Sequence, residues 1–189
     1  MTRRRLAVKR HLLIGAFLSW LLGIPGLPGL PELIAAEPSP ASSQPGQSFP
    51  DLGNLHIKQL GDSHLPYNSD PPTSGPHMPG IAPWGAYDQP IPKEYQVHNL
   101  EDGGVVIQYH CPKGCPELVK KLEGVFFKYR ARAAKEHKYQ HLILAPYPGM
   151  KTRIALTAWT RLNQFHDFDE ARIDRFIEAY VGIDHHSKQ

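Results

Sequence analysis

The feature that most constrains the fold is a long stretch, residues 51–96, that is dense in proline, glycine, asparagine, aspartate and serine. Proline fixes φ and removes a backbone donor, so this stretch cannot supply long helices or central strands. Its aromatic residues nevertheless make it too apolar for a disordered linker; they are Tyr67, Trp84, Tyr87 and Tyr95. We predict a long ordered loop, which either carries a site or covers the core as an irregular lid.

Regular structure is predicted to begin after Gly103 and Gly104. The run VVIQY, residues 105–109, is β-branched and aromatic and predicts a strand. Pro116 is typical of a first helical position. An apolar stripe at helical spacing follows it: Leu118, Leu122, Val125, Phe126, Tyr129 and Ala133. HLILA (141–145) and RIALTAW (153–159) predict two further strands, which we expect to pair as a hairpin across PYPG.

A second helix is predicted near the C-terminus. Asp167 and Glu170 resemble a capping box, and four apolar residues then face inward: Ile173, Phe176, Ile177 and Tyr180. The order β-α-β-β-α predicts an α+β fold, with a small mixed sheet and both helices packed on it. The long Pro/Gly-rich ordered loop precedes this core.

The N-terminus has the layout of a signal peptide. A basic segment, MTRRRLAVKRH, precedes an apolar run that prolines interrupt, and small residues close the stretch. We predict a signal peptide over residues 1–36, cleaved after Ala36, and export to the periplasm or the cell exterior. An uncleaved anchor is the alternative, although a membrane-spanning helix needs about 20 apolar residues in succession. The arginine run also fits, more weakly, the twin-arginine export route.

Removal of the first 36 residues changes the net charge. The whole chain carries +3, and these residues hold five basic side chains and one acidic side chain, so the remainder carries −1. Such a domain has no general electrostatic affinity for nucleic acid, and we expect no nucleic-acid partner. Residues 37–49 are predicted to be a disordered tether, residues 50–184 a single globular domain, and residues 185–189 a flexible tail.

Both cysteines lie in YHCPKGCPEL, Cys111 where the first strand ends and Cys115 where a helix begins. A helix N-terminus stabilises a thiolate. Three interpretations stay open. The pair can be a structural disulfide, as is common in exported proteins, or a redox-active dithiol. It can also form a soft-metal site together with histidines, for which copper(I) is the first choice and zinc the second.

Two histidines are candidates to complete a metal site. His77 lies in PPTSGPHM, where Gly75 and Pro76 fix the turn that presents it. His98 lies in VHNLEDGG, immediately before the strand that leads to Cys111. Further side chains could act as alternate ligands or orient a ligand: Met78, Glu101, Asp102 and His110. The other histidines, among them His56, His185 and His186, are predicted to be surface residues.

Five short sequence motifs together resemble those of a bacterial exported family catalogued as a domain of unknown function. They are SDPPTSGPH, VHNLEDGG, CPKGCPEL, APYPG and IALTAWTR, and they span about residues 67–180. The resemblance implies an extracytoplasmic setting and a site near His77 and His98, but no reaction. Where the family pattern reads LEHGG, this chain has Asp102. As a ligand, that carboxylate would suit zinc or copper(II) better than copper(I); otherwise it would orient His98.

The cysteine loop also resembles, over HCPKGCPEL alone, the copper-binding CxxxCP loop of Sco-type copper chaperones. That resemblance implies thiolate ligation by Cys111 and Cys115. We therefore expect an exported protein that binds or handles a transition metal, with copper first and zinc as the alternative. Its ligands would be Cys111, Cys115, His77 and His98, and a metal-receiving or membrane-associated protein would be its partner.

Two other functions stay open. The chain could be a thiol-disulfide oxidoreductase that acts through the cysteine pair, or a non-catalytic partner-binding domain with a structural disulfide. Hydrolysis is disfavoured because the sequence has neither a nucleophile elbow nor an HExxH motif. The sequence does not specify the oligomeric state.

Overall fold

The computed structural model describes residues 44–186. The predicted signal peptide, its cleavage site and most of the tether lie outside the described residues and stay predictions. Among residues 44–186, no helix combines the length and the apolar character that a bilayer crossing requires.

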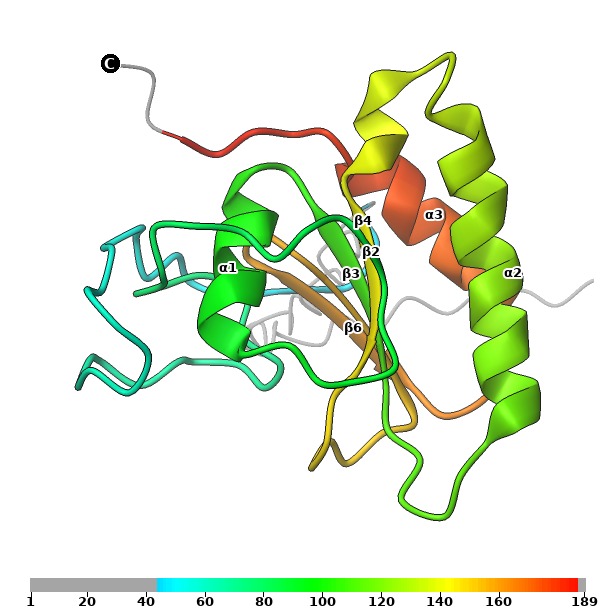
Figure 1. Ribbon diagram of the computed structural model, residues 1–189, viewed down its shortest axis with the longest axis horizontal. Coiled ribbons are helices and arrows are strands. Elements are labelled where there is room, and N and C mark those ends of the chain that lie inside the picture. Colours follow the sequence, from blue (N-terminus) through cyan, green and yellow to red (C-terminus); the bar gives the residue numbers. More distant parts are fainter. Residues whose placement is uncertain (1–43, 187–189) are drawn as a thin grey trace, which may run out of the picture. The chain divides into compact units, whose positions relative to one another are not determined.

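The described chain is an α+β domain with a mixed sheet, as the sequence predicted. The sheet separates α1 from α2 and α3 (Figure 1). The sheet order is β1-β6-β5-β3-β4-β2. The strands are β1 (Gln47–Ser48), β2 (Gly85–Ala86), β3 (Val105–Tyr109), β4 (Leu142–Pro146), β5 (Ile154–Ala158) and β6 (Arg161–Phe165). The helices are α1 (Lys93–Glu101), α2 (Pro116–Arg132), α3 (Glu170–Tyr180) and the short 3-10 helix η1 (His137–Gln140).

The central strand β3 is covered on both faces. Val105 and Ile107 pack in the cluster that contains α2 and α3, whereas Val106 packs in the cluster that contains α1. Successive side chains of a strand point to opposite faces, so an unbroken apolar run indicates a strand buried on both sides. The same alternation places Leu144 of β4 with α2 and α3, and Ile143 with α1.

The prediction that β4 and β5 pair as a hairpin across PYPG is wrong. β3 lies between the two strands in question, because it pairs parallel with β4 and antiparallel with β5. A parallel β3–β4 pair needs a crossover, and α2 supplies it. The actual hairpin joins β5 to β6 through Trp159 and Thr160.

Helices α2 and α3 carry the apolar stripes that the sequence predicted. Pro116 is the first residue of α2. Asp169 caps α3 by accepting a hydrogen bond from the Arg172 N–H at 2.9 Å, so this helix begins two residues later than a cap at Asp167 would place it. The residues that face the sheet are buried: Leu118, Leu122, Val125, Phe126 and Tyr129 on α2, and Ile173, Phe176, Ile177 and Tyr180 on α3.

Helix α1 is absent from the predicted element order. It begins at Lys93, inside the stretch that we expected to contain no long helix, directly after Pro92. Its buried face is largely polar, which is why no apolar periodicity indicated it. That face includes Gln96, His98, Asn99 and Glu101.

Backbone pairing extends beyond residues 50–184 at both ends. Gln47 and Ser48 fall in the predicted tether, but they pair with β6 as an edge strand. His185 falls in the predicted flexible tail, but its backbone N–H donates to the carbonyl of Glu101 at 2.8 Å. Both segments pair with backbone groups that are far away in the sequence. Amino-acid composition does not reveal such pairing.

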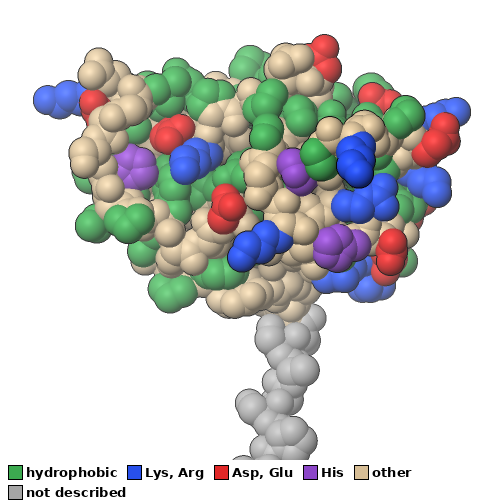
Figure 2. All heavy atoms as spheres, turned by 90° about the horizontal axis from the view of Figure 1, so that it is seen from below, with side chains coloured by type: hydrophobic (Ala, Val, Ile, Leu, Met, Phe, Trp, Pro, Cys, Tyr) green, Lys and Arg blue, Asp and Glu red, His purple; other side chains and the backbone are tan. Residues whose placement is uncertain are grey.

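One face of the domain is drawn in Figure 2. Basic and acidic side chains are interspersed on it, with apolar side chains between them, and they form no continuous field of one sign.

Candidate metal centre

Two segments of the long loop lie side by side and bring two histidines together. The Ile57 N–H donates to the His77 carbonyl at 2.8 Å, and the His77 N–H donates to the Leu55 carbonyl at 3.0 Å. This short parallel bridge sets His56 beside His77, with ring centroids 5.0 Å apart. His77 is fully buried, whereas His56 is exposed. The loop is therefore ordered, as predicted, and it contributes half of a cluster.

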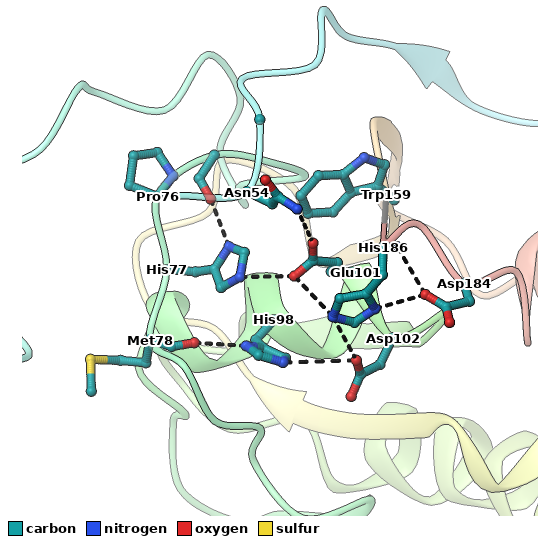
Figure 3. Close-up of polar contacts among 12 residues, drawn as sticks. Asn54, Pro76, His77, Met78, His98, Glu101, Asp102, Trp159, Asp184 and His186 are labelled. Carbon is teal, nitrogen blue, oxygen red and sulfur yellow. Dashed lines mark hydrogen bonds and ion pairs between the residues drawn. The ribbon is translucent and has the colours of Figure 1, made fainter. Parts of the chain in front are cut away.

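Helix α1 supplies the other half. His98 and Glu101 are three residues apart, so they share a helix face. The His98 ring lies 5.0 Å from the His77 ring and stacks on the His56 ring at 5.3 Å. Glu101 has no exposed surface, and its Oε1 accepts a hydrogen bond of 2.7 Å from the Asn54 amide (Figure 3).

Backbone carbonyls determine how the two buried histidines are oriented. Nδ1 of His77 donates to the Gly75 carbonyl at 2.8 Å, and Nδ1 of His98 donates to the Met78 carbonyl at 2.8 Å. A carbonyl only accepts, so in each neutral ring Nδ1 carries the hydrogen and Nε2 presents a lone pair. Metal-bound histidines are usually held in this way.

The Nε2 lone pair of His77 faces a carboxylate oxygen. His77 Nε2 lies 3.0 Å from Glu101 Oε2, and both side chains are completely buried. Neither atom has a hydrogen-bond partner among the described residues. Two facing acceptors at this distance require a cation between them, either a proton or a metal ion. Burial is the largest effect on His77 and lowers its pKa below 6.5, although the Gly75 carbonyl and the Glu101 carboxylate raise it.

Four side chains can reach one ion. One ligand atom each from His56, His77, His98 and Glu101 can be chosen so that all lie within 4.8 Å of one another. Zinc binds nitrogen and oxygen at about 2.0–2.2 Å, which separates tetrahedral ligand atoms by roughly 3.4 Å. Small movements of the side chains would therefore close the cluster around an ion.

The C-terminal segment approaches the same place. His98, Asp102 and His186 form a second group whose ligand atoms lie within 4.8 Å of one another. The Asp102 carboxylate lies 3.8 Å from His98 Nε2 and 3.7 Å from His186 Nε2. Asp102 faces the Nε2 atoms of both rings, and Nδ1 of His98 is already bonded to the Met78 carbonyl, so the position of Asp102 fits the role of an alternate ligand better than that of a partner that orients His98.

The cysteines are joined to each other and lie outside both groups. Cys111 and Cys115 form a disulfide with a Cα–Cα distance of 5.7 Å, which was one of the three interpretations. As a disulfide they offer no thiolate. They pack against the α2–α3 cluster, and His110 lines a hollow with them instead of joining His77 and His98. Met78 contributes its carbonyl, and its thioether points away from the His98 ring (Figure 3).

Three residues of this region were not predicted as site residues from the sequence: Asn54, His56 and His186. His56 is a single histidine in a segment without periodicity, and His186 follows His185 in a polar C-terminal run; only the tertiary structure brings them to α1. Within the sequence, the hints were the number of histidines, 11 in 189 residues, and the adjacent pair His185–His186 near the C-terminus, which can bind metal.

The fold and the cluster together define an α+β domain with a buried histidine–carboxylate group that could hold a metal ion. Residues 58–189 match the family described as a protein of unknown function, DUF3105. The chain belongs to this family, in agreement with the predicted membership of a domain-of-unknown-function family. No curated protein and no solved structure matches significantly. The likeness of the cysteine loop to Sco-type chaperones stays a prediction.

Proposed function

We propose that this protein binds a transition-metal ion through His56, His77, His98 and Glu101. The observation that carries the proposal is the buried pair of unpartnered acceptors, His77 Nε2 and Glu101 Oε2, 3.0 Å apart. A bound cation satisfies both atoms at once and neutralises a carboxylate that has no exposed surface.

The donor set favours zinc or copper(II). Three imidazole nitrogens and one carboxylate oxygen are borderline to hard ligands, whereas copper(I) prefers thiolates and thioethers. The first choice from the sequence, copper(I) held by Cys111 and Cys115, loses support because these sulfurs form a disulfide and belong to neither ligand group. Copper remains within the proposal in its divalent state.

The ligand set is typical of a site that holds a metal ion and not of a catalytic site that turns over a substrate. Structural zinc sites have four protein ligands, whereas catalytic sites keep one position open for water. Here four protein ligands are available, and two of them, His77 and Glu101, have no exposed surface. We therefore propose metal binding or handling, in the exported setting that the N-terminal residues predict and with a metal-receiving partner.

The test is titration of the metal-free protein with zinc and with copper(II), followed by elemental analysis. We expect one ion per chain. His98→Gln should weaken binding by more than the roughly 10–100-fold that loss of an orienting partner costs. The double variant Cys111→Ser/Cys115→Ser and the surface variant His166→Gln should bind as the wild type does. Folding of each variant is checked by circular dichroism. Absence of stoichiometric metal, or loss of metal only in the cysteine variant, would refute the proposal.

The disulfide supports a second candidate, thiol-disulfide exchange. Cys115 lies at the N-terminus of α2, and both cysteines are half-exposed. Lys113 and Arg153 line the same hollow, and cations at a helix N-terminus lower a thiol pKa. A redox titration against glutathione tests this candidate. A midpoint below about −300 mV would mark the bridge as structural.

A further inference from the structure

The C-terminal segment, residues 182–186, is attached to the end of α1 and the turn between α1 and β3. Gly182 donates its N–H to the Gly103 carbonyl at 2.7 Å, and His185 donates its N–H to the Glu101 carbonyl at 2.8 Å. A Cβ on Gly103 would lie 2.8 Å from the backbone nitrogen of Ile183, so the segment rests directly on a glycine. The His185 ring stacks on Trp159, with centroids 5.9 Å apart.

This attachment brings His186 to the proposed centre. Its Nδ1 lies 2.7 Å from Asp184 Oδ1, and its backbone N–H donates to the same oxygen at 2.9 Å. The Asp184 carboxylate holds the hydrogen on Nδ1, and Nε2 faces the carboxylates of Glu101 and Asp102. His186 is thus the third histidine of the region whose Nδ1 has an oxygen acceptor and whose Nε2 points inward (Figure 3).

A single carboxylate oxygen lies between two of these nitrogens. Glu101 Oε2 is 3.0 Å from His77 Nε2 and 3.5 Å from His186 Nε2. An ion bound at this oxygen is therefore within reach of both imidazoles. The two histidines differ in accessibility: the His77 side chain is fully buried, whereas the His186 side chain is 45% exposed.

We propose that His186 is an additional, exchangeable ligand of the metal centre, and that residues 182–186 form a gate that controls release of the ion. This inference rests on the proposed metal-binding function. The segment follows Val181, which is buried in the α2–α3 cluster, and it contains neither helix nor strand, so it can detach without unfolding the sheet. Detachment removes one ligand and uncovers the ion, while His77, His98 and Glu101 stay in place. That is the behaviour required of a protein that transfers a metal to an acceptor.

The experiment measures how fast zinc passes from the loaded protein to an excess of a chromogenic chelator. We compare the wild type, His186→Ala, Asp184→Asn and the matched surface control His166→Ala. We expect His186→Ala to keep one ion per chain and to release it on the order of 10-fold faster or more, as loss of a supporting interaction typically weakens metal sites 10–100-fold. Asp184→Asn should release it at an intermediate rate, and His166→Ala at the wild-type rate.

The absorption spectrum of a cobalt(II)-substituted protein shows whether His186 binds the ion or only covers it. Cobalt(II) replaces zinc, and its visible absorption responds to the number and type of ligands. A changed cobalt spectrum in His186→Ala, together with faster release, supports ligation. An unchanged release rate and spectrum would overturn the inference and leave the metal-binding function intact. Complete loss of metal in His186→Ala would also overturn it, because His186 would then be an obligatory ligand. Absence of metal in the wild type would refute both proposals.

Discussion

Replacement of Glu101 by glutamine should change stability and metal binding in opposite directions. In the metal-free wild type, Oε1 of this residue accepts from Asn54, and Oε2 faces the His77 Nε2 lone pair at 3.0 Å. A glutamine in the same position keeps the acceptor toward Asn54 and places an amide N–H opposite His77. The unpartnered acceptor then gains a donor, and a buried charge disappears.

The magnitudes follow from the two interactions. An unsatisfied buried polar group costs about 1–3 kcal/mol, so metal-free Glu101→Gln should be more stable than the wild type by an amount of that order. Zinc at 100 times its dissociation constant should stabilise the wild type by about 2.7 kcal/mol, since the ion binds only the folded state. In a domain of this size that corresponds to a rise in Tm of roughly 5–10 °C. Glu101→Gln lacks the anionic ligand and should show no such rise.

The assay is thermal unfolding near pH 7.5, with a chelator and then with zinc. Glu117→Gln, an exposed substitution on α2, serves as the charge-matched control and should behave as the wild type does. The reasoning is refuted if metal-free Glu101→Gln is less stable than the wild type, or if zinc stabilises both proteins equally. The first result would mean that a proton already bridges the pair at neutral pH.

Three further predictions concern other parts of the molecule. The double variant Cys111→Ser/Cys115→Ser should lose only about 2 kcal/mol of unfolding free energy in a urea titration, because the bridge closes a very short loop. A larger loss would contradict this entropic estimate. Gly103→Ala should hasten zinc release without changing any ligand, because its φ of +78° and its close approach to residues 182–183 leave no room for a Cβ. Gly80→Ala, where a Cβ meets nothing, is the control, and equal release rates would count against the gate. Burial lowers the pKa of His141, so the unfolded chain binds a proton more readily, and metal-free stability should fall as the pH drops below about 6.5. The urea midpoint from pH 8 to pH 5 tests this, and a smaller fall in His141→Gln would assign part of it to this residue.

The helices and strands with an apolar periodicity were predictable from the sequence, whereas helix α1, whose buried face is mainly polar, was not. β3, β4, α2 and α3 all follow from hydrophobic patterns. Helix α1 does not, since its buried face consists mainly of polar side chains that bond to the long loop. Asn99, for example, accepts from the Ala82 N–H at 3.0 Å and donates to the Ala82 carbonyl at 2.9 Å. Such a helix is stabilised by specific partners and not by an apolar stripe.

The hairpin between β5 and β6 escaped prediction for a different reason. Its turn contains Thr160 at a φ of 59° in place of the glycine or asparagine that usually indicates a tight hairpin. The sequence motifs did predict His77 and His98 in one candidate site, and the structure brings these two residues together with Glu101. The prediction also placed the cysteines in this site, because they follow His98 closely in the sequence. In the structure β3 lies between them, so His98 precedes one end of the strand and Cys111 follows the other.

The loop segments that carry His56 and His77 are joined by three backbone hydrogen bonds, the third from the Gly75 N–H to the Gly53 carbonyl. An ion bound beside these segments would join the N-terminal loop to α1, and through His186 to the C-terminus, so it would act as a cross-link over most of the domain. The disulfide, by contrast, spans a sequence separation of 4. Loop-closure entropy grows with the length that is closed, so the ion would constrain the unfolded chain more than the covalent bond does. Resistance of the long loop to proteolysis would then report how much of the protein carries metal.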